Sequence, residues 1–569
     1  MALTLNRHVT PVLLLVAAAL ATLWPLTPFH AIPGHPLSDV ADHYWGHWWW
    51  GGELLAGRLP LRSAISHLPL AVPHWYPDPL GAFLALLFRP LGQPAAFGLS
   101  ALLVLVLNGV VAYALALDLA ARRAAALLAG LAVQTCPYAL GVLHNGTTEY
   151  LGLFLPLLFI WSLQRALEGR GRPLTAGLLL AGCTLQCLYY GVFAGLWACC
   201  CLAGGGLRQR AGVVGRVLGY GALASAPVVA MVAWTLWSGH GPVRVLPEGM
   251  RSGLSLPGVD LTLFLRPGAR CFPDLAAAGN PATRYVHYLG WPLTLLGVWG
   301  LWRHTRLRAL RAPLLLWGVV CLGPVLVWGG AQVHLGQHAI PLPLALLYAI
   351  PYSPVAHIHH PYRAVAFLVP LLALGAAAAV ARWPRWLLPV LAAAMLAETA
   401  LLSPAIWPLP RTDVRAPPIY AQLSGPGAVL SWPADKGTWN HAYRAWQVEH
   451  GRPMAQGVNV SLTPPVQRDN LVRDLLFAQG RPPTPTGSRA PPGATRLERP
   501  VPGQPSALGR MGFGWLVLHE ASLPAGEADP VERRLRAWLG EPAVMVGDDL
   551  AWRIPAEEVA APARLGTGP

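Results

Sequence analysis

The sequence has little charge, a single lysine and few cysteines, and each shortage excludes a class of protein. Only 12% of its 569 residues are charged, against roughly 25% in soluble globular domains. Lys436 is the one lysine, so nearly all of the positive charge comes from arginine. Seven of the eight cysteines lie in apolar runs, so we expect no disulfide framework. These shortages exclude an ordinary soluble protein and a disulfide-rich secreted domain.

The sequence does contain a series of apolar runs of the length that crosses a bilayer as a helix, about 17–25 residues. Hydrophobic residues make up 54% of the chain, and the mean hydropathy is +0.44. Helix is expected for each run, because a spanning segment must satisfy its own backbone hydrogen bonds. Eleven runs are predicted to span: 11–29, 95–121, 124–143, 150–167, 173–189, 190–206, 214–238, 286–302, 313–330, 363–382 and 385–405.

The arginines predict the orientation, because every second connection between these runs is short and rich in arginine. Arg122 and Arg123 close one pair of runs, and Arg382 and Arg385 close the last. Such connections face the cytoplasm. The N-terminus is then cytoplasmic, and eleven spans place the C-terminus outside a bacterial inner membrane. This distribution explains the net charge of +15 better than nucleic-acid binding does.

Residues 1–405 are therefore predicted to form an α-helical polytopic membrane domain with three long outer loops, 30–94, 239–285 and 331–362. The first loop includes Leu80–Leu91, which is too short to span and is expected to lie along the interface. From residue 406 the prolines and charges rise, and residues 406–569 are predicted to form an extracytoplasmic α/β or α+β domain. Its expected elements are strands at Ala428–Trp432, Gly514–Leu518 and within Val544–Ile554, and a helix at Val531–Leu539.

The first outer loop carries the first candidate site. Ser38 is expected to cap a helix that places Asp39 and Asp42 on one face, three residues apart. Two carboxylates with His43 nearby suit general-base chemistry at the lip of a membrane cavity, and Trp45 could stack on a sugar ring. The alternative is that the aspartates only cap the helix and the tryptophans anchor it at the interface.

Two further candidates lie on other outer segments. Glu149 either opens a helix, where a carboxylate favours the dipole, or is a further acid facing the same cavity. Arg363 opens a predicted span, where its guanidinium can grip a phosphate or reach lipid headgroups. His360 is expected to lie beside a leaving phosphate, and the neighbouring His357 and His359 form a weak metal pattern.

This layout resembles the GT-C superfamily of membrane glycosyltransferases, which includes the protein O-mannosyltransferases and the lipid A aminoarabinose transferases. The matching segments are short: Ser38-Asp39 followed by Trp45 and Gly57–Pro60, Leu185–Gly191, Tyr288–Gly290, Ile340–Pro343, Pro361–Arg363, Gln447–Pro453 and Leu508–His519. Two positions depart from the family pattern. The acids are spaced Asp39-x-x-Asp42 rather than Asp-x-Asp, and histidines stand where an arginine is expected before Pro361.

The resemblance implies transfer of a sugar from a polyprenyl-phosphate carrier to an unidentified glycan, lipid or protein acceptor. Asp39 would be the base, assisted by Asp42 or Glu149, and Arg363 with His360 would stabilise the leaving phosphate. The resemblance implies no certain cofactor and leaves room for a divalent metal. The alternatives are a transporter or flippase for a lipid-linked sugar, whose supporting feature is Glu398 within a predicted span, and a non-catalytic scaffold.

Overall fold

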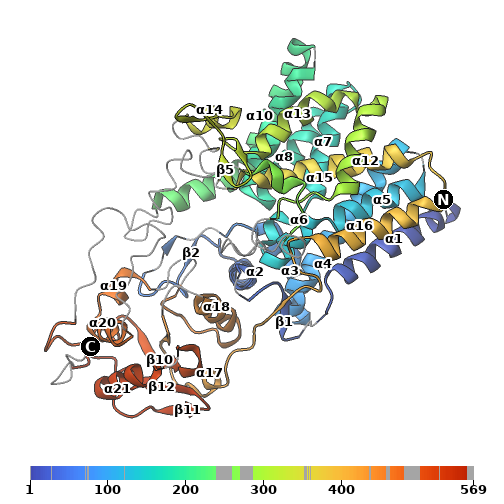
Figure 1. Ribbon diagram of the computed structural model, residues 1–569. Coiled ribbons are helices and arrows are strands. Elements are labelled where there is room, and N and C mark those ends of the chain that lie inside the picture. The colour runs from blue at the N-terminus through green and yellow to red at the C-terminus, as the bar shows by residue number, and fades with distance from the viewer. Residues whose placement is uncertain are drawn as a thin grey trace. The chain divides into compact units, whose positions relative to one another are not determined.

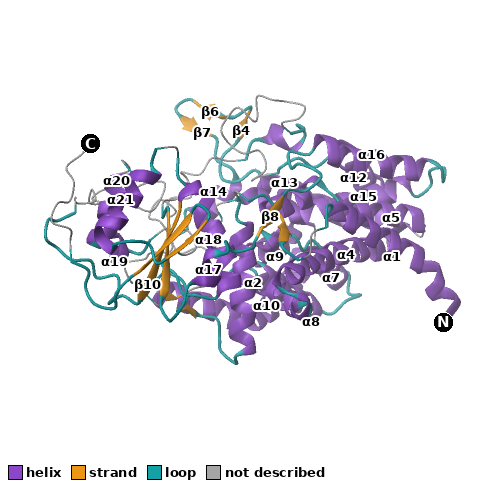
Figure 2. Cartoon of the chain, turned by 90° about the horizontal axis from the view of Figure 1, so that it is seen from below, coloured by secondary structure: helices purple, strands orange, loops and turns teal. Residues whose placement is uncertain are grey.

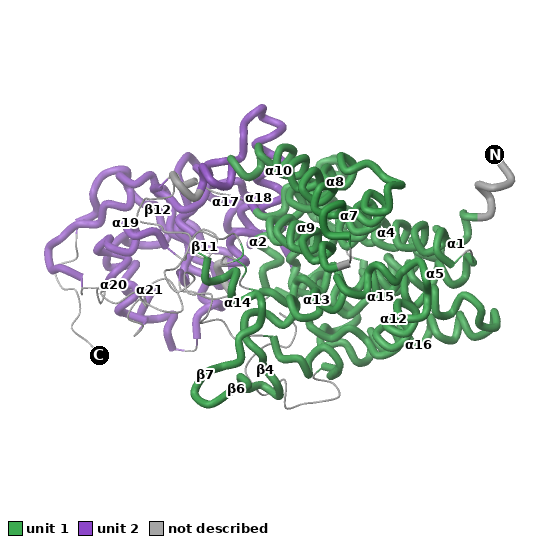
Figure 3. The backbone as a smooth tube through the Cα atoms, turned by 90° about the horizontal axis from the view of Figure 1, so that it is seen from above, with its two compact units in different colours: residues 1–43, 77–230, 249–412 green, residues 44–76, 231–248, 413–569 purple. Residues whose placement is uncertain are grey.

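The computed structural model describes residues 2–26, 29–36, 38–70, 72–73, 76–120, 122–204, 206–238, 259–268, 286–350, 355, 358, 360–434, 438–456, 462–479, 500–524 and 526–560. The chain divides into two compact units, coloured separately in Figure 3. The first unit contains residues 1–43, 77–230 and 249–412, and the second contains residues 44–76, 231–248 and 413–569. The division predicted at residue 405 stays a prediction, and the two units are described one at a time.

The first unit is built mainly of helices (Figure 1). Its α-helices are α1 (Ala2–Thr22), α3 (Pro79–Leu86), α4 (Gln93–Ala120), α5 (Arg123–Gln134), α6 (Pro137–Asn145), α7 (Phe154–Leu167), α8 (Pro173–Gln186), α9 (Leu188–Cys200), α12 (Trp291–Arg303), α13 (Arg311–Cys321), α14 (Pro343–Tyr348), α15 (Val365–Val380) and α16 (Leu387–Leu402). Two further helices belong to both units: α2 (Val40–Leu55) begins in the first unit and lies mostly in the second, and α10 (Leu207–Ser238) lies mostly in the first.

Shorter elements connect these helices. The 3₁₀ helices are η1 (Arg89–Leu91), η2 (Thr148–Tyr150), η3 (Cys201–Gly204), η6 (Leu261–Phe264), η7 (Thr305–Leu310) and η9 (Pro361–Ala364). Among the residues that the structure describes, short strand pairs accompany them: β1 (Ala31–Pro33) with β8 (Arg411–Asp413), β4 (Val327–Trp328) with β5 (Ala331–Gln332), and β6 (His334–Leu335) with β7 (His338–Ala339).

The prediction of a polytopic helical fold is confirmed. Each of the eleven predicted runs contains a helix. Among the described residues, five stretches are long and apolar enough to cross a membrane: Gln93–Ala120, Arg123–Asn145, Thr148–Leu167, Leu207–Thr235 and Pro361–Val380. These stretches fit membrane insertion, while the total of eleven spans stays a prediction.

Small residues let two of the helices approach closely. A Cβ atom added to Gly300 of α12 would lie 1.8 Å from the carbonyl oxygen of Gly375 on α15, and one added to Gly375 would lie 2.2 Å from that of Gly297. Backbone contact of this kind is the usual way for helices to associate in lipid, where burial of apolar side chains gives no net drive.

Glu398, the one acid predicted within a span, has a structural role. It lies on α16, and its Oε1 accepts hydrogen bonds from the Trp291 N–H at 2.8 Å and the Tyr288 hydroxyl at 2.6 Å. The carboxylate therefore satisfies a free donor at the N-terminus of α12, as helix ends require. These contacts do not test the transporter alternative, which stays an alternative.

The predicted interfacial piece at Leu80–Leu91 consists of α3 followed by η1. Its large apolar side chains point away from the unit, with Phe83, Leu87 and Leu91 exposed by 50%, 67% and 59%. The opposite face of α3, made of small residues, is buried. An apolar outer face on a helix too short to span fits a position along the membrane surface.

The second unit is built around a four-stranded sheet in the order β11-β12-β10-β9, drawn in orange in Figure 2. Its strands are β9 (Ala428–Trp432), β10 (Phe513–His519), β11 (Val544–Val546) and β12 (Asp549–Arg553). The β9–β10 pair is parallel and the other two pairs are antiparallel. Its other elements are α17 (Ile419–Gln422), α18 (Thr438–His450), α19 (Pro464–Gln467), α20 (Asn470–Ala478), α21 (Ala528–Leu539), η10 (Glu520–Ser522), β2 (Arg62–Ser63) and β3 (Val72–Pro73).

Both faces of this sheet are covered, as the continuous apolar runs predict. Leu430 and Leu516 pack on one side in a cluster that includes residues of α20 and α21. Val429 and Val517 pack on the other side against α17. The four predicted elements of this region are confirmed, and α18 and α20 are helices that the sequence reading did not predict.

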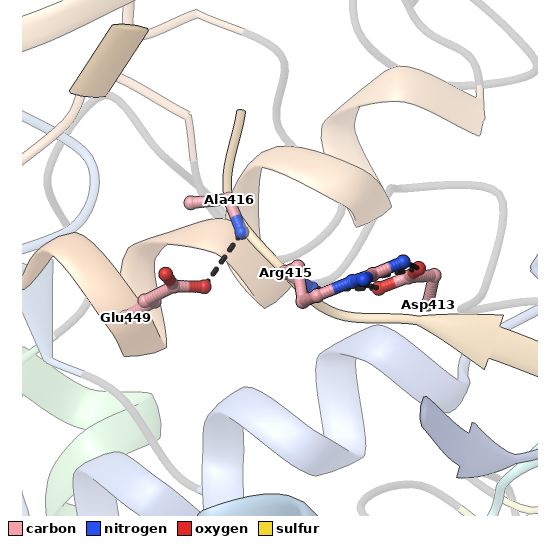
Figure 4. A network of polar contacts seen from close by, with 4 residues as sticks. All are labelled: Asp413, Arg415, Ala416 and Glu449. Atoms are coloured by element: carbon pink, nitrogen blue, oxygen red, sulfur yellow. Dashed lines mark hydrogen bonds and ion pairs between the residues drawn. The ribbon is translucent and has the colours of Figure 1, made fainter. Parts of the chain in front are cut away.

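The connection that enters the second unit is fixed to α18 (Figure 4). The Ala416 N–H donates to a carboxylate oxygen of Glu449 at 2.7 Å, and Arg415 forms an ion pair with Asp413. Arg415 is largely exposed, so we expect its ion pair to contribute little to stability. The bond from Ala416 holds the chain where α17 begins.

His450 gives the second unit a predicted dependence on pH. Burial and the nearby Arg452 lower the pKa of His450 to about 4. Its Nδ1 accepts the Arg452 N–H at 3.1 Å, a bond that protonation would break, and its ring stacks on Tyr420 at 4.5 Å.

The pKa of His450 is lower in the folded state than in the unfolded state. Its contribution to the free energy of unfolding is therefore fully present above about pH 6.5 and is lost as the pH drops towards 4. The loss is at most about 3 kcal/mol. Pulse proteolysis of the full-length protein across this range measures it. His450→Asn should flatten the dependence, and an unchanged slope in that variant would contradict this account.

Candidate active site

The two aspartates of the first outer loop lie where α2 begins. The carbonyl oxygen of Asp39 accepts the N–H groups of Asp42 at 3.0 Å and His43 at 3.1 Å, which starts the helix. Asp39 is exposed and Asp42 is half-buried. Carboxylate oxygens of the two residues lie within 4.8 Å of each other. The helix therefore places both acids on one face, as their spacing predicts.

Ser38 does not cap this helix in the predicted way. Its hydroxyl donates to the carbonyl oxygens of His35 at 2.6 Å and His144 at 3.4 Å. The hydroxyl therefore ties the loop to the end of α6 instead of accepting from the first turn of α2. The sequence reading was wrong here because the hydroxyl bonds the preceding turn at His35, which competes with capping, and makes a longer contact with the distant carbonyl of His144.

The end of α6 packs tightly against the start of α2. Gly146 ends α6 in the left-handed region at φ 70°, and a Cβ atom there would lie 2.3 Å from the Cα atom of Val40. The Nδ2 atom of Asn145 lies 3.5 Å from Oδ2 of Asp39. This close approach brings the segment that carries Glu149 to the aspartates.

Glu149 and His43 form a buried pair. Glu149 lies in η2 and is 4% exposed. The Nε2 atom of His43, on the first turn of α2, lies 3.4 Å from Oε2 of Glu149. Of the two alternatives for Glu149, its position in the first turn of a 3₁₀ helix fits the opening of a helix, and its contact with His43 fits an acid at the aspartate site. Both alternatives for Glu149 stay predictions.

The backbone around Glu149 is not α-helical, and polar side chains satisfy it. Between α6 and α7 the chain leaves carbonyl groups without helical partners. Gln186 donates to the carbonyls of Glu149 at 3.0 Å and Gly152 at 2.9 Å. Asn108 donates to Leu151, and the Tyr190 hydroxyl donates to Tyr150 at 2.6 Å. Irregular backbone at membrane depth is tolerated only where protein satisfies it in this way.

Arg363 lies in η9 and is 9% exposed. Its guanidinium carbon lies 3.5 Å from the ring centre of Tyr150, a close cation–π contact. Its charge interacts with that of Glu149. Arg363 is buried among protein side chains. This position does not fit the alternative that its guanidinium extends to lipid headgroups.

A small cavity opens beside this guanidinium. Tyr138, Tyr150, Tyr362 and Arg363 line it, and the remaining lining is small or apolar: Gly141, Val142, Thr147 and Val286. The Nε atom of Arg363 is buried and makes no hydrogen bond to the described residues. The cavity has room for about one water molecule, and its guanidinium is a donor that suits an oxyanion.

His360 is half-buried directly before η9, with its ring 6.1 Å from that of Tyr362. His357 and His359 lie outside the described residues. Trp45 belongs to the second unit, where it is fully buried, donates to Gln447 at 2.6 Å and stacks on Trp49. The first unit thus brings together Asp39, Asp42, His43, Glu149 and Arg363, while the predicted substrate role of Trp45 stays a prediction.

Sequence reading missed several residues of this site. Asp78 is buried and accepts a hydrogen bond from the hydroxyl of Thr148, the residue before Glu149. Tyr150 supports Arg363, and Gln186 holds the backbone of Glu149. Gln186 lies in a segment that carries the GT-C resemblance. A buried polar residue in an apolar run was the one available signal for its role.

A comparison with solved structures identifies the fold of the chain. Arabinofuranosyltransferase AftD from Mycobacteria matches 99% of this chain with a TM-score of 0.50 and 17% identity. The chain has a GT-C fold. It spans 42% of the length of the AftD chain, so the likeness concerns the shared architecture and not the whole of that protein.

Two other solved structures resemble the chain more weakly. The archaeal oligosaccharyltransferase AglB from Archaeoglobus fulgidus, in complex with an inhibitory peptide and a dolichol-phosphate, matches 97% of this chain and 76% of its own, with 12% identity and a TM-score of 0.46. ArnT from Cupriavidus metallidurans, bound to undecaprenyl phosphate, matches 99% of both chains, with 13% identity and a TM-score of 0.41. No family model and no curated protein matches the sequence.

Proposed function

We propose that this protein is an integral membrane glycosyltransferase that moves a sugar from a polyprenyl-phosphate carrier to an acceptor on the outer face of the membrane. One observation carries the proposal. Within a unit of GT-C fold, exposed Asp39 lies beside the buried His43–Glu149 pair, and a buried guanidinium lies on the ring of Tyr150, the residue after Glu149. This arrangement provides a base and an anion-stabilising group in one site.

In the proposed reaction Asp39 removes the proton of an acceptor hydroxyl, because it is the exposed member of the acidic pair. The acceptor oxygen forms a bond to the anomeric carbon as the bond from that carbon to the phosphate oxygen breaks. One such displacement inverts the configuration of the sugar. The electron pair leaves with the polyprenyl phosphate.

Arg363 stabilises the negative charge that develops on this leaving phosphate. A preorganised donor in a site that excludes water is typically the largest single contribution to catalysis. The ring of Tyr150 supports the guanidinium, whose carbon lies 3.5 Å from the ring centre. His360, directly before the helix that carries Arg363, would assist at the same phosphate. An apolar groove between helices would hold the lipid tail.

Asp42 and Glu149 assist the base from two sides. Asp42 shares the face of α2 with Asp39, and Glu149 fixes His43 on the same helix turn. If the enzyme uses a divalent cation, Asp39 and Asp42 would hold it, because hard cations prefer carboxylate oxygens. Such an ion would supply additional positive charge beside the phosphate.

The proposal includes an orientation with a cytoplasmic N-terminus, a periplasmic C-terminal region and a bacterial inner membrane as the location. The arginine-rich short connections support it. Alkaline phosphatase fused after residue 560 should be active, since this reporter folds only outside the cytoplasm. An inactive fusion, with full activity for a reporter at a cytoplasmic arginine loop, would reject this orientation.

Carrier binding tests the proposed substrate class. The purified protein in lipid nanodiscs is incubated with undecaprenyl phosphate and with phosphatidate, which has a phosphate of equal charge on a different lipid. We expect native mass spectrometry to detect bound undecaprenyl phosphate that an equal concentration of phosphatidate does not displace. Equal displacement by phosphatidate would mean that the site recognises a phosphate without an isoprenoid tail.

A further inference from the structure

Asp78 is an acid that the proposed reaction does not use. It is 1% exposed and directly precedes α3. Its Oδ1 accepts the Gly81 N–H at 2.8 Å, which caps that helix. Its Oδ2 accepts a hydrogen bond from the Thr148 hydroxyl. One carboxylate thus joins the interfacial helix to the first residue of η2.

The bond to Thr148 reaches the site, because Thr148 and Glu149 are consecutive residues of a single 3₁₀ turn. The carbonyl of Glu149 is held on its other side by Gln186. Asp78, Thr148 and Gln186 line one small cavity beside this turn. The turn is therefore held through its side chain at Thr148 and through its backbone at Glu149.

Capping alone does not explain an ionisable group at this position. Asparagine and serine cap helices about as well as aspartate, whereas burying a carboxylate is costly unless it is paired or well hydrogen-bonded. Asp78 and Glu149 are two buried acids, and Asp78 contacts the residue directly before Glu149. Buried ionisable groups gathered at one place in a fold indicate a functional site.

We propose that Asp78 is a positioning residue of the transfer reaction, and that it acts through the Thr148 hydroxyl to hold Glu149 against His43. This inference rests on the proposed function. If the turn shifts by about 1 Å, the assisting pair moves away from the base, and such a displacement can cost about 100-fold in rate.

The test is a double-mutant cycle in full-length protein in nanodiscs, with sugar transfer from polyprenyl-phosphate donors as the assay. Asp78→Ser keeps a residue type that caps helices but is too short to hold the cap and reach the Thr148 hydroxyl together, and Thr148→Val removes that hydroxyl. Each single variant should lower kcat by about 10- to 100-fold and change the donor KM by less than about threefold. The double variant should equal the single variants, because both act through one bond.

Two controls keep the outcome clear. Thr148→Ser retains the hydroxyl and should restore kcat to within about threefold of the wild type. Asp260→Ser makes the same change at another aspartate, whose Oδ1 accepts a hydrogen bond from the Thr262 hydroxyl at 2.8 Å, and it should leave kcat unchanged. Thermal unfolding midpoints identify variants that fail to fold, and Thr148→Val then carries the test without loss of the helix cap.

The inference is overturned if the losses of the two single variants multiply in the double variant, or if a folded Asp78→Ser protein retains wild-type kcat. It is also overturned if the loss lies entirely in the donor KM. A wild-type protein that transfers no sugar from any donor would instead overturn the proposed function, and the inference with it.

Discussion

Asp39→Asn is expected to lower kcat for sugar transfer by about 10²- to 10⁴-fold, the contribution of a general base. An amide cannot accept the proton of the acceptor hydroxyl at neutral pH. The side chain is exposed, and its contact with Asn145 is long, so the substitution should leave folding intact. Steady-state rates in nanodiscs measure the loss, and a thermal unfolding midpoint within about 2 °C of the wild type verifies the fold.

A matched control is Asp413→Asn, which changes an aspartate in the second unit that is paired with Arg415. It should retain wild-type kcat. Asp42→Asn is expected to give an intermediate loss, since Asp42 assists and does not itself remove the proton. A folded Asp39→Asn protein with activity near the wild type would exclude Asp39 as the base.

Arg363→Lys is expected to lower kcat/KM for the donor by about 10²- to 10³-fold, the effect of removing one preorganised donor to a developing oxyanion. Lysine retains the charge but has no planar group to lie on the ring of Tyr150 or to contact a phosphate with two nitrogens. The substitution should therefore fail to rescue the function although it preserves the charge.

The supporting ring provides the matched pair of variants for this prediction. Tyr150→Phe keeps the aromatic face under Arg363 and should stay within about threefold of the wild type, whereas Tyr150→Leu removes the cation–π contact, worth up to about 2 kcal/mol when desolvated. Full activity of Arg363→Lys, or equal activity of the two Tyr150 variants, would contradict the assigned role of the guanidinium.

The architecture could be predicted because it depends on local patterns. The run Ala428–Trp432 is a strand with the predicted bounds and five buried residues, since both faces of its sheet are covered. The acids of α2 share a face because helical geometry fixes residues three apart. α18 was missed because its apolar residues are spread among polar ones and no long apolar run marks it.

The contacts of the site depend on residues far apart in the sequence. Glu149 meets His43 across 106 positions, and Thr148 meets Asp78 across 70. Nothing in the spacing of these residues indicates which acid would be buried or which would stay exposed. Ser38 is a different case, because a local alternative exists: its hydroxyl bonds the carbonyl of His35 instead of capping the helix it precedes.

The most direct test of the account is transfer from defined donors. Purified protein in nanodiscs is given a panel of polyprenyl-phosphate hexoses and pentoses, with a membrane fraction as acceptor and with no nucleotide sugar. The account predicts that at least one donor is converted to free polyprenyl phosphate only when acceptor is present, and that its sugar is attached with inverted anomeric configuration. Consumption of nucleotide sugars alone, with every polyprenyl-phosphate donor left intact, would contradict it.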